Sequence, residues 1–296
     1  MILTGVLPPI TTPFKNDRFD PIALRHNIER WSRSGLSGLV VLGSNGEAPL
    51  LDDEESDRII ATARELTPTD LLLIAGTGRE STDGTIAATR RAAAHGVDAV
   101  LVRTPSYFKR QLTSDVLIRH YRAVADASPV PVLLYNFTAA TGINLQPEAV
   151  ARMADHPNIM GIKESGGDVA QVAALVDLTP DDFTVVVGAA PSFYPSLCLG
   201  AAGGIMAVAC VAPEACVRLY RLACEGRHAE ARALQRQITP LAALVTTGHG
   251  VPGLKAAMDA AGFVGGDPRP PLQPAGASAV GELRAALDAL SRLEPA

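Results

Sequence analysis

The sequence has little charge and few aromatic residues. Charged residues make up 19% of its 296 residues and aromatic residues 4%, and 26 lysines and arginines are nearly balanced by 31 aspartates and glutamates. Because no block of basic residues occurs, we expect no binding to nucleic acid. The hydrophobic content of 47% excludes an intrinsically disordered chain.

Cysteine and clustered histidine are scarce as well. The four cysteines include no C-x-x-C pair, so neither a zinc ribbon nor a disulfide framework is expected, and a reduced, cytoplasmic setting is favoured. The six histidines show neither H-x-H nor H-E-x-x-H spacing, which disfavours a metal site and a metal-dependent aldolase. The sequence also has no Walker A motif, and Ser81 replaces the third glycine of a G-x-G-x-x-G motif. We therefore expect no metal and no cofactor.

Long uninterrupted apolar runs are missing too. The N-terminal stretch MILTGVLPPITTPF has no charged segment and is broken by Pro8 and Pro9, so it is not a signal peptide. The longest nearly uncharged stretch, Phe183 to Val211, is interrupted by Pro191, Pro195 and several glycines. We expect no membrane span.

Short apolar runs alternate with amphipathic stretches along the chain. Eight such runs, each followed by a helical pattern, recur about every 20 to 30 residues, which is typical of βαβ units. They are apolar on both faces, as parallel strands covered by helices are. This pattern predicts a (β/α)₈ TIM barrel rather than a doubly wound sheet. The predicted strands are Gly5–Thr11, Gly38–Leu42, Leu71–Ala75, Ala99–Val102, Val132–Asn136, Ile159–Lys163, Phe183–Gly188 and Gly204–Val208.

Three further helical patterns follow the eighth unit, at Ala229–Val245, Pro252–Ala261 and Ala279–Leu290. They are too short and too thinly apolar to fold alone. We therefore expect the barrel to cover residues 1–226 and a C-terminal helical extension, residues 227–296, to pack on it as part of one structural unit.

Lysine is the scarcest charged residue type, and its positions are informative. Of Lys15, Lys109, Lys163 and Lys255, Lys163 alone ends a predicted strand. In a barrel of this kind the active site lies at the carboxyl ends of the strands. Burial there disfavours the ammonium form and favours the neutral amine that a Schiff-base nucleophile needs. The alternative is a structural lysine that is paired with Glu164 or solvated.

Other strand ends carry groups that could assist this chemistry. Tyr135 could move protons, or it could simply fill the barrel. The donor-rich turn Ser44-Asn45-Gly46 could hold a carboxylate, or it could be an ordinary turn between strand and helix. Tyr107, on a predicted loop, is by default a surface or interface aromatic.

Taken together, these strand ends resemble the family of dihydrodipicolinate synthase and N-acetylneuraminate lyase, which are class I pyruvate aldolases on a (β/α)₈ barrel. The resemblance covers nearly the whole chain. Its motifs are Gly5-Val6, Thr12-Pro13-Phe14, Gly43-Ser44-Asn45-Gly46-Glu47, Ala75-Gly76-Thr77-Gly78, Thr104-Pro105-x-Tyr107, Tyr135-Asn136 and Gly161-Ile162-Lys163-Glu164.

Within that family the chain most resembles 4-hydroxy-2-oxoglutarate aldolase. This likeness rests on Gly43–Glu47, on His156-Pro157-Asn158-Ile159 leading to Lys163, on Lys163–Val169, and on the tail segment Gly250–Lys255 with Gly265-Gly266 and Pro271-Leu272-Gln273.

The resemblance implies a role for each matching residue. Lys163 matches the Schiff-base lysine and Tyr135 the proton-transferring tyrosine, while Ser44 stands in place of a threonine that relays protons to Tyr107. Tyr107 matches a residue that reaches into a neighbouring subunit, which implies a homo-oligomer, a tetramer built as a dimer of dimers. The expected substrate-binding residues are Ser44, Asn45, Ser165, Gly188 and Ile205, with Ser165 near the distal end of the substrate.

The chain also departs from the family pattern. Alanine at position 140 replaces the arginine with which the lysine-biosynthetic synthase holds a substrate carboxylate, and Thr138 replaces a proline. The positions of that enzyme's lysine-feedback pocket hold Asp53, Ser56, Glu80, Gly84 and Ser106. These departures favour an aldolase over the synthase.

We therefore expect a class I aldolase, a carbon–carbon lyase that cleaves a 4-hydroxy-2-oxo acid, above all 4-hydroxy-2-oxoglutarate, to pyruvate and an aldehyde such as glyoxylate. The alternatives are an aldolase or dehydratase for 2-oxo-3-deoxy sugar acids, 4-hydroxy-tetrahydrodipicolinate synthase and, from a different class, a non-catalytic protein that binds a 2-oxo acid.

Overall fold

Eight parallel strands form the central sheet of the computed structural model, which describes residues 3–292. The strands are β1 (Gly5–Leu7), β4 (Gly38–Val41), β5 (Leu72–Gly76), β6 (Ala99–Arg103), β7 (Val132–Asn136), β8 (Ile159–Glu164), β9 (Thr184–Val187) and β10 (Gly203–Ile205). From β4 to β10 each strand pairs with its neighbour in sequence, and β10 pairs with β1. A parallel bridge between Pro9 and Val40 links the two remaining edges, β1 and β4. The predicted (β/α)₈ TIM barrel is thereby confirmed.

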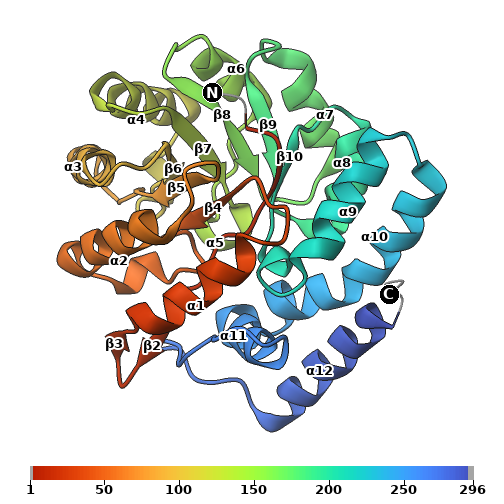
Figure 1. Cartoon of the computed structure of the whole chain (residues 1–296). Helices are drawn as coiled ribbons and strands as arrows, with labels where there is room; N and C mark the ends of the chain where they lie inside the picture. The colour runs from red at the N-terminus through yellow and green to blue at the C-terminus, as the bar shows by residue number, and fades with distance from the viewer. Residues whose placement is uncertain (1–2, 293–296) are drawn as a thin grey trace.

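Helices surround the strands, and Figure 1 shows them as an outer ring. They are α1 (Pro21–Trp31), α2 (Asp53–Leu66), α3 (Thr82–Ala94), α4 (Ser114–Ala127), α5 (Thr138–Thr141), α6 (Pro147–Ala154), α7 (Val169–Leu178), α8 (Phe193–Cys198), α9 (Pro213–Cys224), α10 (His228–Ala243), α11 (Gly250–Ala260) and α12 (Ala277–Ser291). The helix α2 is capped by Asp52, whose side chain accepts the N–H of Glu55 at 2.8 Å.

Two predicted strands are shorter than expected. The first ends at Leu7 rather than Thr11, since Pro8 and Pro9 lack the N–H groups that a longer strand pairing would use. The eighth ends at Ile205 rather than Val208, because residues 207–210 turn into a 3₁₀ helix. The sequence reasoning also missed a hairpin of β2 (Phe14–Lys15) and β3 (Arg18–Phe19), whose two turn residues, Asn16 and Asp17, have φ values of 51° and 58°. Asparagine and aspartate tolerate this left-handed conformation better than most residues.

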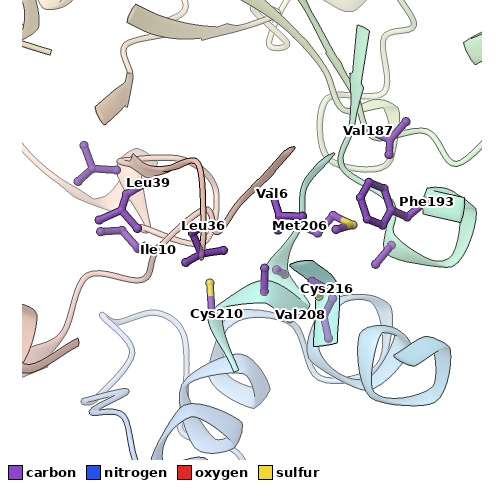
Figure 2. Close-up of a cluster of buried hydrophobic side chains, with 14 of the residues drawn as sticks. Val6, Ile10, Leu36, Leu39, Val187, Phe193, Met206, Val208, Cys210 and Cys216 are labelled. Atoms are coloured by element: carbon purple, nitrogen blue, oxygen red, sulfur yellow. The ribbon is translucent and has the colours of Figure 1, made fainter. Parts of the chain in front are cut away.

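Buried side chains form two layers because residues alternate between the faces of each strand. One layer fills the barrel interior and includes Leu101, Leu133 and Tyr135. The other lies between the strands and the helices, and Figure 2 shows Val6, Met206 and Phe193 together in it. Packing on both faces explains why the strands read as continuous apolar runs.

The helices after residue 227 pack against the barrel. The helix α10 lies on α9, and α11 packs against α12 near the β2–β3 hairpin (Figure 1). The ring of Phe263, just after α11, stacks on Trp31 of α1 with centroids 5.3 Å apart. The guanidinium group of Arg30 lies over the Phe263 ring, 4.7 Å from its centroid.

Among residues 3–292, no helix combines the length and apolar composition needed to cross a lipid bilayer.

One buried titratable group lies between two helices of the ring. His120 on α4 is 6% exposed, and its Nδ1 lies 2.9 Å from the Thr82 hydroxyl at the start of α3. Its Nε2 is buried and has no hydrogen-bond partner in the described part of the chain. Burial lowers the pKa of His120 to about 4.

We expect His120 to make the fold sensitive to acid. Its pKa is lower in the folded protein than in the unfolded chain, so the unfolded chain binds the extra proton as the pH falls from about 6.5 toward 4. Over that window the free energy of unfolding should fall by up to about 3 kcal/mol, and above it His120 contributes no pH dependence. Denaturant titrations of wild type and His120→Gln between pH 7 and pH 4 measure this: the variant should show a flatter profile. The exposed His26 provides the matched control, and an equal flattening in His26→Gln would contradict the assignment.

Candidate active site

Lys163 lies inside the barrel, near the carboxyl end of β8. Its side chain projects inward with that of Tyr135, its register partner on β7. Lys163 is 4% exposed, and its Nζ lies over the Tyr135 ring, 4.3 Å from the centroid. Within residues 3–292 no carboxylate forms an ion pair with it. The amine is thus buried against an aromatic face instead of being neutralised by an acid.

Glu164, the next residue, points to the opposite face of β8. Its carboxylate accepts the amide of Asn136 at 2.7 Å, the amide of Gln171 at 2.8 Å and the backbone N–H of Gly166. Lys163 and Glu164 therefore do not form an ion pair, because consecutive residues of a strand face opposite sides of the sheet. Lys163 is not solvated either.

A glycine makes room for Lys163 on the neighbouring strand. A Cβ atom at Gly188, just after β9, would lie 2.9 Å from the Lys163 Cε and 1.8 Å from the Ser165 Oγ. The Ser165 hydroxyl is itself buried and has no hydrogen-bond partner among the described residues. Lys163, Ser165 and Gly188 therefore meet at one place, where the unpartnered hydroxyl is available to a ligand.

Tyr135 joins this place to the turn that follows β4. Tyr135 is 5% exposed, and its hydroxyl lies 3.5 Å from the Ser44 Oγ, at the long limit of a hydrogen bond. Both line a small cavity with Gly43, Gly76 and Arg103. Lys163, Tyr135 and Ser44 consequently form one continuous set of groups.

The turn Gly43–Glu47 presents unpaired backbone donors. The N–H groups of Gly46 and Glu47 donate to Gly43 and Ser44 at 3.1 Å, whereas those of Ser44 and Asn45 donate to no acceptor within residues 3–292. The Asn45 side chain donates to the carbonyl of Pro9 at 3.2 Å, so it braces the turn. Two free N–H groups and the Ser44 hydroxyl are suited to a carboxylate.

Tyr107 lies apart from this set. It is 79% exposed on the loop after β6, and its ring contacts the edge of Phe108, with centroids 5.0 Å apart. Within this chain the structure therefore brings together Lys163, Tyr135, Ser44, Ser165 and Gly188, but not Tyr107.

Ile205 and Ala140 are two further positions singled out from the sequence. Ile205, the last residue of β10, is fully buried in the layer that fills the barrel. Ala140, on the short helix α5, is exposed and carries no polar group that could hold a carboxylate.

The sequence reasoning gave no role to Arg103 and none to Glu80 beyond its place in the lost feedback pocket. The Glu80 carboxylate accepts the N–H groups of Ser106 and Tyr107 at 2.8 and 2.9 Å and the Arg103 Nη1 at 2.9 Å. Partial burial favours its neutral form, but these donors outweigh it and lower the pKa of Glu80. Arg103 continues the inward series of Ala99 and Leu101 on β6, which is the signal that could have revealed it.

A second overlooked pair is Glu47 and Lys255, which are both buried and 2.5 Å apart. Glu47 belongs to the turn that presents the free N–H groups, whereas Lys255 belongs to α11. No local sequence pattern connects residues so far apart in the chain.

Within residues 3–292, no group of three or more histidine, cysteine, aspartate or glutamate side chains is arranged to hold a metal ion.

Comparisons with known proteins place this geometry in context. Residues 2–290 match the family model described as "Dihydrodipicolinate synthetase family". A protein of Methanothrix thermoacetophila named 4-hydroxy-tetrahydrodipicolinate synthase is 37% identical over 292 residues, covering 98% of this chain and 97% of the relative. Six further relatives that are 36–40% identical carry the same name.

Solved structures of dihydrodipicolinate synthase family proteins are also similar to this chain. A protein described as a monomeric dihydrodipicolinate synthase variant superimposes with a TM-score of 0.94 at 32% identity, covering 98% of both chains. An Escherichia coli K12 prophage protein of the dihydrodipicolinic acid synthase family, solved with pyruvate, gives a TM-score of 0.93 at 29% identity and covers 98% of this chain and 99% of that protein.

Proposed function

Because the chain belongs to the dihydrodipicolinate synthetase family and is a carbon–carbon lyase of the class I aldolase type, we propose that Lys163 is its Schiff-base nucleophile. The observation that carries this proposal is the burial of the Lys163 amine over the Tyr135 ring without a carboxylate partner in the described residues. A lysine near the carboxyl end of a barrel strand lies where the active site of such barrels is found, and its amine is the group that forms a Schiff base with a 2-oxo acid.

The reaction that these groups support is the cleavage of a 4-hydroxy-2-oxo acid. The amine of Lys163 attacks C2, and water leaves to give an iminium ion. Tyr135 takes the proton of the C4 hydroxyl, the C3–C4 bond breaks, and its electron pair moves toward the iminium nitrogen to form an enamine while an aldehyde leaves. Protonation at C3 and hydrolysis by one water then release pyruvate and the free lysine.

The remaining groups of the site would bind the substrate and relay protons. The free N–H groups of Ser44 and Asn45 hold the C1 carboxylate, and the Ser44 hydroxyl passes protons to and from Tyr135, 3.5 Å away. Ser165, whose hydroxyl is unpartnered beside Lys163, bonds the distal part of the substrate, and Gly188 leaves space for it.

For the substrate itself we propose 4-hydroxy-2-oxoglutarate, with glyoxylate as the aldehyde. The motifs around Lys163 and in the tail segment support this choice, and Ala140 cannot supply the arginine contact that the synthase makes with its substrate. The same lysine chemistry would serve a 2-oxo-3-deoxy sugar acid.

A specific observation favours a second candidate, 4-hydroxy-tetrahydrodipicolinate synthase. Seven curated relatives bear that name at 36–40% identity, so the comparisons support this alternative better than the aldolase. In that reaction the same enamine would attack an aldehyde instead of being formed by its loss. The two candidates therefore share Lys163, Tyr135 and Ser44 and differ in the aldehyde partner.

Tyr107 would complete the proton relay from a neighbouring subunit. Its exposed ring sits on a loop that is fixed through Glu80, and it lies outside the site of its own chain. We propose a homo-oligomer in which Tyr107 of one subunit approaches Ser44 and Tyr135 of another.

Borohydride trapping tests the Schiff base. Pyruvate and borohydride should add the mass of one reduced pyruvyl group to the wild-type chain, because the reagent reduces the iminium to a stable amine. Lys163→Ala should gain no mass and should lose at least about a thousandfold in turnover. Lys109→Ala, which removes an exposed lysine, is the matched control. An adduct that persists in Lys163→Ala would refute the assignment, and reversible pyruvate binding without any adduct or turnover would instead favour a non-catalytic binding protein.

A substrate panel separates the candidate reactions. We expect pyruvate release from 4-hydroxy-2-oxoglutarate to exceed that from 2-oxo-3-deoxy sugar acids, and we expect little condensation of pyruvate with aspartate semialdehyde, since Ala140 cannot bind its carboxylate. Introducing an arginine by Ala140→Arg should raise the condensation rate relative to cleavage. Efficient condensation by the wild-type protein would establish the synthase in place of the aldolase.

Subunit complementation tests the role of Tyr107. Tyr107→Phe should lower kcat by about tenfold to a hundredfold and leave borohydride trapping intact, because the relay serves proton transfer. Mixing Tyr107→Phe with Lys163→Ala should restore activity, since a hybrid oligomer contains sites with Lys163 from one subunit and Tyr107 from another. A mixture with no gain over its separate components, or a monomer of full activity, would contradict action between subunits.

A further inference from the structure

Two buried charges remain outside the chemistry described so far. The side chains of Glu47 and Lys255 are 1% and 2% exposed, and the Glu47 Oε1 lies 2.5 Å from the Lys255 Nζ. Burying two charges is costly unless both are fully bonded. The bonds that these groups make therefore indicate what the pair holds in place.

Lys255 contacts three polar partners. Besides its ion pair with Glu47, its ammonium donates to the backbone carbonyls of Thr12 at 2.8 Å and Asp267 at 2.7 Å. It also lies over the Phe14 ring, 4.7 Å from the centroid. Burial lowers the pKa of Lys255, and the Glu47 carboxylate opposes that shift. One side chain of α11 thus links three separate segments of the chain.

Glu47 ends the turn that carries Ser44 and Asn45. It has a left-handed backbone, with φ at 59°, which a residue with a side chain adopts at a cost unless its surroundings hold it there. Its second carboxylate oxygen accepts the N–H of Arg269 at 2.7 Å. One oxygen of Glu47 is thus paired with Lys255 and the other accepts a hydrogen bond from Arg269, so both face the chain after residue 250.

The turn has little freedom on its other sides. The carbonyl of Gly46 accepts the Thr12 hydroxyl at 2.8 Å, and a Cβ at Gly46 would lie 3.0 Å from the backbone N of Leu42. With Gly46 held in this way, the anchoring of Glu47 fixes the far end of the turn that carries Ser44 and Asn45.

We propose that Lys255 is a positioning residue, which acts through Glu47 to orient the turn Gly43–Glu47 so that Ser44 and Asn45 can bind the substrate carboxylate. The inference rests on the proposed function of that turn. It gives the C-terminal helices a role in substrate binding, although they supply no group that touches the substrate. The competing explanation is that the ion pair only holds α11 on the barrel.

Variants of Lys255 and Glu47 distinguish the two explanations. Lys255→Met leaves Glu47 buried and unpaired, and it should unfold at a lower temperature than wild type. The double variant Glu47→Gln/Lys255→Met removes both charges and should recover much of that stability. If Lys255 positions the turn, the double variant should still need about tenfold more pyruvate for half-maximal borohydride trapping. A recovered double variant with the wild-type pyruvate dependence would overturn the proposal.

Arg269→Met provides the matched control. It removes another connection between tail and barrel, the half-buried pair of Arg269 with Glu55, and keeps the backbone N–H that bonds Glu47. We expect it to lower thermal stability without changing the pyruvate dependence. If the double variant does not fold, Lys255→Met alone makes the same comparison at a temperature below its unfolding transition.

Hydrogen exchange keeps the test independent of the proposed reaction. Amides of residues 43–47 should exchange at least about tenfold faster in the double variant or in Lys255→Met than in wild type, and at the wild-type rate in Arg269→Met. Unchanged exchange in the variants that lack Lys255 would refute the positioning role. If the wild-type protein formed no pyruvate adduct, the proposed function would fail, and exchange at the turn would still decide this inference.

Discussion

The alternation of side chains along closed parallel strands is the constraint on which the site depends. It sends Lys163 into the barrel and Glu164 outward, where Asn136 and Gln171 bind the carboxylate. A lysine and a glutamate that are adjacent in sequence are thereby kept apart, and the amine is left beside Tyr135 without a neutralising acid. The same alternation places Tyr135 and Arg103 on the inner face of their strands, so one geometric rule assembles the wall of the site.

The site is surrounded by a framework of carboxylates that fix loops rather than react. Glu164 binds residues after β8, Glu80 holds the amides of Ser106 and Tyr107, and Glu47 ties the turn after β4 to α11. Each of these acids satisfies backbone N–H groups or a cation that would otherwise be unpaired. The groups given chemical roles are consequently an amine, hydroxyls and free backbone N–H groups on loops that these acids hold.

Much of this could be predicted from the sequence because it follows local rules. The recurring apolar runs predicted the eight strands, and the rarity of lysine at strand ends singled out Lys163. The errors have local causes as well. Pro8 and Pro9 shortened the first strand, and Asn16 and Asp17 formed a hairpin turn whose two short strands lack a recognisable apolar pattern.

The sequence by itself determined the barrel class and the residues that face its mouth, because hydrophobic periodicity records which side of each element is buried. The tertiary structure alone decided which of these residues meet. Ser44 approaches Tyr135, and Lys255 reaches Glu47 across more than two hundred residues of chain. Such contacts depend on closure of the barrel and on the packing of α11 against it. Local sequence patterns describe neighbouring residues only, so they do not show which distant segments the fold brings together.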